Sequence, residues 1–125
     1  MKFARVLIGA LVVLGVLSAI AARPASAEMM CTEEMLPTIA SLSDCVSHAY
    51  AAGHIDNLGV AQALQATLST AQAALDRGQP AVAINILQAF IYQVQAQAGV
   101  HITADHAQHM IEHAQMVIAA LSALP

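Results

Sequence analysis

The stretch PAVAINILQAFIYQVQAQAG, residues 80–99, decides the fold class of this chain. Pro80 suits the first turn of a helix, where the N–H that proline lacks would have no partner. Gly99 suits the position just after a helix, which often takes a left-handed backbone conformation. Between these two residues the apolar side chains spread over more than half of the helix circumference, at about 100° per residue. Residues 80–99 therefore predict a central helix that contacts two neighbours, although the pattern leaves open whether part of its surface binds a partner or a second copy of the chain.

Similar start and stop signals divide the sequence on both sides of this stretch. One helix is expected from about residue 37 to 52, before Gly53, and a second, capped by Asp56 or Asn57, is expected to end near Arg77. A last helix is expected to begin at the cap Thr103 and to run to about residue 124. No run of alternating polar and β-branched residues predicts a strand. Because the connections are short, the predicted fold is all-α, a compact bundle of four mainly antiparallel helices.

The first 27 residues have the pattern of a secretory signal peptide. Lys2 and Arg5 form a basic start, an apolar run covers residues 6–22, and Ala25-Ser26-Ala27 offers a cleavage site. An uncleaved membrane anchor is the alternative, but the apolar run is slightly shorter than the roughly 20 residues that a spanning helix needs. We therefore expect cleavage after Ala27, a secreted or periplasmic location and no membrane association afterwards.

The expected mature chain is a single acidic domain. It consists of an N-terminal arm, residues 28–36, and a helical bundle, residues 37–125. Arg77 is its one Lys or Arg against eight Asp and Glu, a formal charge of −7. Nucleic acid and anionic lipid are poor partners for such a surface, because both are bound through clustered basic side chains. A protein or another cell-envelope component is the expected partner.

Two cysteines, Cys31 and Cys45, would enter an oxidising compartment together, which favours a disulfide. A continuous helix would hold them about 21 Å apart, whereas a disulfide needs Cα atoms within about 7 Å. We therefore expect the arm to lie outside the helix and to fold back beside Cys45. Free thiols and metal ligation are the alternatives, and a nucleophilic Cys45 assisted by His48 would require a reduced thiol.

Histidines gather in the last predicted helix. On a helical wheel His106, His109 and His113 share an arc of roughly 120° with Asp105, Glu112 and Met116. The predicted core stripe of this helix is separate, so the histidines should flank the core; it consists of Ala107, Met110, Ala114, Val117 and Leu121.

These three histidines are a candidate metal site, because imidazole suits zinc and copper. Thioether ligands for cuprous copper could come from Met29, Met30, Met35 and Met116. The alternatives are an ordinary polar outer face and a surface that responds to pH, since clustered histidines repel each other when protonated. No nucleophile with a base, carboxylate pair or phosphate-binding glycine loop has convincing spacing, so we expect no enzyme activity and no cofactor.

Four fragments of the sequence occur in an order typical of a known family. They are GHIDN at 53–57, AALDRGQ at 73–79, AINILQAFIYQVQAQAG at 83–99, and the Ile-Thr pair at 102–103. Together they resemble the FIMAH domain, a small helical module often found at the end of secreted bacterial and archaeal proteins, and the resemblance extends from about Leu36 to Leu121.

The resemblance implies an accessory or interaction module without catalytic residues. The chain departs from the usual arrangement, because no catalytic domain accompanies the module and because the arm and the histidines of the last helix look unlike the typical domain. The expected function is therefore a secreted, non-catalytic accessory module. The alternative is a periplasmic or extracellular protein that binds zinc or copper through His106, His109 and His113.

Overall fold

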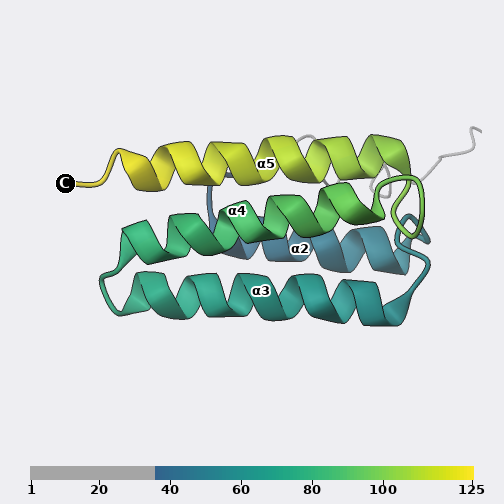
Figure 1. Ribbon diagram of the computed structural model, residues 1–125, viewed down its shortest axis with the longest axis horizontal. Helices are drawn as coiled ribbons and strands as arrows, with labels where there is room; N and C mark the ends of the chain where they lie inside the picture. Colours follow the sequence, from purple (N-terminus) through teal and green to yellow (C-terminus); the bar gives the residue numbers. More distant parts are fainter. Residues whose placement is uncertain (1–35) are drawn as a thin grey trace, which may run out of the picture.

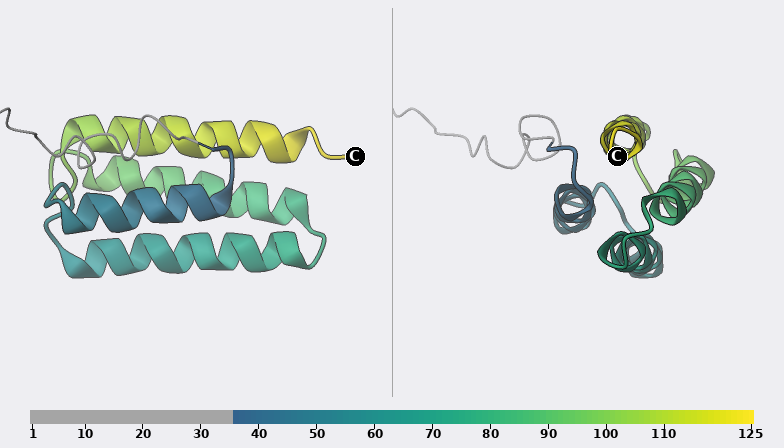
Figure 2. Two further views of the ribbon diagram at one scale, coloured as in Figure 1. Left: turned by 180° about the vertical axis from the view of Figure 1, so that it is seen from behind. Right: turned by 90° about the vertical axis from the view of Figure 1, so that its left-hand side faces the viewer.

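The computed structural model describes residues 36–125 as four helices packed side by side (Figure 1). They are α2 (Ile39–Ala51), α3 (Leu58–Asp76), α4 (Pro80–Gln97) and α5 (Ala104–Ser122). Each helix runs opposite to the one before it, and the end-on view in Figure 2 places them around a common centre in the order α2, α3, α4, α5. Within residues 36–125 no strand is present, so the predicted all-α bundle is confirmed.

Side-chain caps fix where two of the helices begin. The Thr38 hydroxyl accepts a hydrogen bond from the Ser41 N–H at 3.1 Å, so Thr38 is the N-cap and α2 begins at Ile39, two residues after the expected start near residue 37. Asn57 caps α3, because its Oδ1 accepts from the Val60 N–H at 3.0 Å. Thr103 occupies the N-cap position of α5 as expected, but its side chain makes no capping hydrogen bond.

Glycines end the first two helices in the predicted way. Gly53 and Gly78 have φ of 87° and 75°, a left-handed conformation that side chains with a Cβ rarely adopt. After α3, the Gly78 N–H donates to the Leu75 carbonyl and the Gln79 N–H donates to the Ala74 carbonyl, both at 2.9 Å. This pair of bonds is a Schellman motif, which satisfies the last carbonyls of the helix and reverses the chain.

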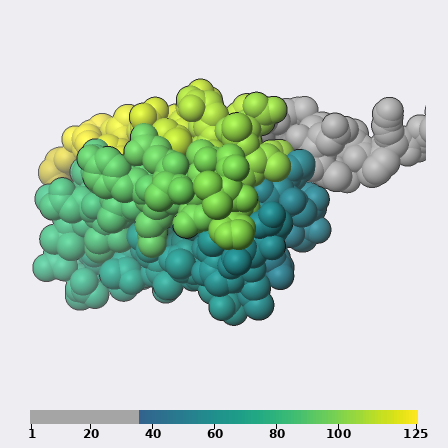
Figure 3. All heavy atoms as spheres, turned by 45° about the vertical axis from the view of Figure 1, so that its right-hand side comes forward, coloured from purple at the N-terminus to yellow at the C-terminus, as the bar shows by residue number. Residues whose placement is uncertain are grey.

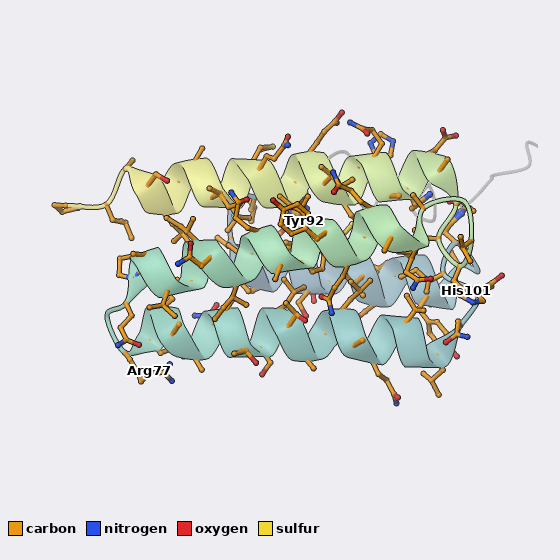
Figure 4. All side chains as sticks on the ribbon, in the orientation of Figure 1. Arg77, Tyr92 and His101 are labelled. Carbon is orange, nitrogen blue, oxygen red and sulfur yellow. The ribbon has the colours of Figure 1, made fainter. Side chains whose placement is uncertain are left out.

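Helix α4 is the central helix that its sequence predicts. It packs against both α3 and α5, more extensively than α2 packs against either of its neighbours. The fully or almost fully buried side chains of α4 are Ala83, Leu87, Phe90, Ile91 and Val94. Ile84 and Ile86 also pack against the core, whereas Tyr92 points away from it (Figure 4). Most of the broad apolar surface of α4 is therefore internal to the bundle.

The two connections at one end of the bundle are joined to each other. Residues 53–57 link α2 to α3, residues 98–103 link α4 to α5, and we call the pair the turn junction. Ile55 and Ile102 form an isolated antiparallel bridge and are both buried. The Asp56 N–H donates to the His101 carbonyl at 3.0 Å. Figure 3 shows the atoms around residue 100 resting against those of the α2–α3 connection.

Candidate functional site

Three histidines meet beside the turn junction, and we call them the histidine cluster. His106 and His109 belong to α5, and His54 belongs to the α2–α3 connection. The rings of His54 and His106 are stacked, with centroids 3.6 Å apart and planes 13° from parallel. The His109 ring meets His106 edge-on, with centroids 6.2 Å apart. All three side chains are partly buried.

The backbone of the junction holds His54 in this position. Its N–H donates to the Ala49 carbonyl at 2.8 Å, as part of the cap that Gly53 allows at the end of α2. Its carbonyl accepts from the Thr103 N–H at 2.9 Å, one residue before α5 begins. His54 is thus tied to α2 on one side and to the start of α5 on the other.

The environment of the cluster favours a neutral imidazole at His106. Partial burial lowers the pKa of His106 below the ordinary value of 6.5, and the neighbouring His54 and His109 lower it further. Asp105 acts in the opposite direction, because its carboxylate favours the protonated ring. The lowering influences are larger, so the His106 pKa falls.

His101 lies in the same junction but has a different partner. Its Nδ1 lies 2.7 Å from Oδ1 of Asp56, and both side chains are well exposed. Figure 4 labels His101 at this end of the bundle and Arg77 at the opposite end. This pair ties the two connections together from outside, as Ile55 and Ile102 do from inside.

His113 does not share the outer face of α5. It is buried, with 1% of its surface exposed, and its Nε2 donates to the Leu36 carbonyl at 2.8 Å. Its Nδ1 is also buried and has no hydrogen-bond partner. The expectation that the histidines flank the core is right for His106 and His109 and wrong for His113, because the chain entering α2 covers that turn of α5.

The three histidines predicted as metal ligands therefore do not converge. Across residues 36–125, no group of three or more His, Cys, Asp or Glu side chains is placed so that it could hold a metal ion. Of the other members of the predicted arc, Glu112 accepts a hydrogen bond from Gln108, and the thioether of Met116 is exposed. The structure brings His54 to His106 and His109, a contact between distant parts of the chain that the helical wheel of α5 does not contain.

Cys45 is buried in α2, whereas His48 is exposed on the last turn of the same helix. The other cysteine, Cys31, lies outside the described residues, as do the expected signal peptide and residues 28–35 of the arm, including Met29, Met30 and Met35. The disulfide between Cys31 and Cys45 stays a prediction.

An apolar groove runs along the outer side of the contact between α2 and α3. Its volume is about 540 Å³. Tyr50 and Leu58, which line it, are 40% and 51% exposed. The lining contains no carboxylate, imidazole, thiol, ammonium or guanidinium group; it consists of Val46, Ser47, Tyr50, Leu58, Ala61, Gln62, Gln65, Ala66 and Ser69.

A hydrogen-bonded glutamine fixes one wall of this groove to the other. Gln65 of α3 donates from Nε2 to the Ser43 carbonyl at 2.9 Å and to the Ser47 hydroxyl at 2.8 Å, both on α2. Its Oε1 accepts from the Ser43 hydroxyl. All hydrogen-bonding atoms of the Gln65 amide are thus engaged with α2, which sets the separation of the two helices at the groove.

Comparison with known protein families identifies the domain. A profile of the FIMAH domain matches residues 39–119. The chain belongs to the FIMAH domain family. No curated protein and no solved structure matches the chain. The matched residues begin with the first residue of α2 and end in α5, so the groove and the histidine cluster both lie within the FIMAH domain. Over residues 36–125, no helix is long and apolar enough to cross a lipid bilayer.

Proposed function

We propose that this FIMAH domain is a non-catalytic interaction module that acts outside the cytoplasm and binds a protein of the cell envelope or the surrounding medium along the α2–α3 groove. The groove is the observation that carries the proposal. Tyr50 and Leu58 both line the groove and expose apolar surface there, and exposed apolar surface gathered in one place is typical of interaction sites.

The composition of the groove suits an interface core. Interface cores are depleted in charged side chains and enriched in aromatic ones, and Tyr50 supplies a large contact area with few rotatable bonds. Serine and glutamine side chains add hydrogen-bonding groups along the walls. An amphipathic helix of a partner, laid between α2 and α3 with its apolar face inward, would match this shape and chemistry.

The hydrogen bonds that hold the walls of the groove together also favour partner binding. Because Gln65 already bridges α2 and α3, little ordering of the two helices is required when a partner binds. The lining contains hydroxyl groups, such as those of Ser47 and Tyr50, but no carboxylate, imidazole or amine that could act on them as a base, which supports binding rather than chemistry.

We prefer this function to zinc or copper binding by His106, His109 and His113. The metal hypothesis depends on three imidazoles that share one face of α5, and His113 is instead buried with its Nε2 engaged by the Leu36 carbonyl. The location outside the cytoplasm is inferred from the signal-peptide pattern of residues 1–27.

The test compares matched tyrosine variants in a binding experiment. Two variants are expressed in the host and purified in the form that the host produces. Tyr50→Asp changes the groove, and Tyr92→Asp on the exposed face of α4 is the control. Each is incubated with envelope and secreted fractions of the host, and recovered proteins are quantified. We expect recovery of a discrete partner to fall by about tenfold or more for Tyr50→Asp, as for an interface hot spot, and to be unchanged for Tyr92→Asp.

Equal recovery with both variants would contradict the proposal. A change in oligomeric state on gel filtration with Tyr50→Asp alone would identify a second copy of the chain as the occupant of the groove. Circular dichroism of each variant verifies that the helices are intact, so that loss of folding is not mistaken for loss of binding.

A further inference from the structure

The histidine cluster joins two elements that must stay together for the turn junction to remain closed. The rings of His54 and His106 lie in van der Waals contact at 3.6 Å, one from the α2–α3 connection and one from the first turn of α5. Stacking of this kind is compatible with two neutral imidazoles. Two protonated imidazoles at the same separation would repel each other strongly in a partly buried site.

The charged groups around the stacked pair do little to relieve that repulsion. From α5, His109 faces His106 edge-on and would add positive charge when protonated, whereas Asp105 provides one compensating carboxylate. The first turn of α3 and the last turn of α4 contain no ionisable side chain. The last turn of α2 contributes His48 and Tyr50, both of them exposed.

The remaining carboxylate of the junction already has a partner. Oδ1 of Asp56 lies 2.7 Å from Nδ1 of His101, so when His101 is protonated the Asp56 carboxylate compensates the charge of His101 and not that of the cluster. The Asp105 carboxylate can compensate one positive charge on the cluster. A second protonated imidazole would be repelled by the first.

Separation of the two rings would act directly on the backbone of the junction. The His54 carbonyl is the acceptor for the Thr103 N–H, and the next residue, Ile55, bridges to Ile102. These contacts connect the α2–α3 connection to the start of α5. A displacement of His54 away from α5 therefore pulls on the hydrogen bond and the bridge that close this end of the bundle.

We propose that the histidine cluster makes the turn junction a pH-sensitive latch, closed when His54 and His106 are neutral and opened when both are protonated. The lowered pKa of His106 agrees with this arrangement. Acidification from about pH 7.5 to about pH 5 spans the range in which histidines charge, so the latch would respond to mild acid outside the cytoplasm. The helices away from the junction would stay folded.

The experiment is amide hydrogen exchange by NMR on the whole purified protein, corrected for the intrinsic effect of pH. Local opening is read at the Thr103 N–H of the junction and, as an internal reference, at the buried Leu68 in the middle of α3. In the wild-type protein we expect the opening equilibrium at Thr103 to increase about tenfold or more between about pH 7.5 and pH 5, with no comparable change at Leu68.

Three variants assign the effect to particular side chains. His54→Gln should abolish most of the pH dependence, because one ring of the stacked pair can no longer charge. His48→Gln, a change at an exposed histidine outside the cluster, should retain it. His101→Gln removes the pair with Asp56, which gains strength when His101 is protonated, and should leave the response intact or enlarge it.

A second measurement needs no variant and so does not depend on the folding of His54→Gln. The ring resonances of His54 and His106 are followed during a pH titration of the wild-type protein, and we expect two coupled steps shared by both rings. Independent single-step titrations, or an opening at Thr103 that stays pH-dependent in His54→Gln, would overturn the proposal. A pH-independent opening in the wild-type protein would also overturn it.

Discussion

The replacement Leu87→Ala tests whether the broad apolar surface of α4 belongs to the core or to an interface. Leu87 has no exposed surface and lies on the helix that α3 and α5 contact from two sides. The replacement removes three carbons, which at about 0.8 kcal/mol each amounts to about 2.4 kcal/mol of lost transfer free energy. Because two helices confine the site, it cannot collapse fully, and the residual cavity raises the expected loss to about 3–4 kcal/mol.

The assay is equilibrium unfolding in urea, followed by circular dichroism, for the wild type and two variants. Val82→Ala is the matched control, since Val82 lies on the same helix but is well exposed; its expected cost is within about 0.5 kcal/mol. For a domain of this size the Leu87→Ala loss corresponds to a Tm decrease of about 15–25 °C. A loss below about 1 kcal/mol for Leu87→Ala, or an equal loss for Val82→Ala, would refute the packing described for α4.

Four further outcomes are expected. Asn57→Ala should lower the unfolding free energy by about 1 kcal/mol in the same assay, because it leaves the Val60 N–H at the start of α3 without its cap; no loss would contradict the cap. The pKa of His106 is lower in the folded protein than in the unfolded chain, so the unfolded chain binds more protons between the two pKa values, and the free energy of unfolding should fall as the pH decreases from about 6.5 toward the folded-state pKa. In urea unfolding curves at several pH values, His106→Gln should reduce this dependence of the unfolding free energy on pH. An unchanged dependence would contradict the lowered pKa of His106. Calorimetric titration with zinc near neutral pH should show no affinity tighter than about 10 μM, because the described residues offer no converging set of three ligands; tighter binding would reinstate the metal hypothesis. Thiol titration of the denatured, unreduced protein should detect no free thiol if Cys31 and Cys45 are paired, whereas two titratable thiols would exclude the disulfide.

The helices were predictable because their ends depend on neighbouring residues. Pro80 begins α4, Asn57 caps α3, and Gly53 and Gly78 take the left-handed conformation after α2 and α3. Each of these signals acts over one helical turn, so it can be read without knowledge of the tertiary fold. The start of α2 at Ile39, two residues after the approximate start expected near residue 37, has an equally local cause, because the Thr38 hydroxyl caps the helix.

The candidate site was less predictable because it depends on contacts between distant segments. Helical periodicity placed His106, His109 and His113 on one arc, but it could not show that Leu36 covers His113. Nor could it show that His54 stacks on His106, since that contact follows from the pairing of two connections. The position of His54 directly after the helix-ending Gly53 is only a weak sequence signal of a functional role. Its contact with His106 becomes visible only in the packing of the turn junction.

The proposed interaction surface lies on other helices than the one whose sequence left an interface open. The apolar excess of α4 pointed to a face of that helix, and packing against α3 and α5 accounts for most of it. The groove is formed by two helices together: Tyr50 of α2 and Leu58 of α3, which come before and after the α2–α3 connection in the sequence, both line it. Hydrophobic periodicity describes one helix at a time and does not contain such a relation between two helices.

Site-specific photo-cross-linking in the living host tests whether the FIMAH domain binds a partner through this groove. A photoreactive phenylalanine analogue replaces Tyr50 in one strain and Tyr92 in another, so that equally aromatic probes report on the groove and on the exposed face of α4. We expect a discrete adduct with one polypeptide from position 50, lost when Leu58→Asp is added, and no such adduct from position 92. No adduct from position 50, or the same adducts from both positions, would contradict binding through the groove.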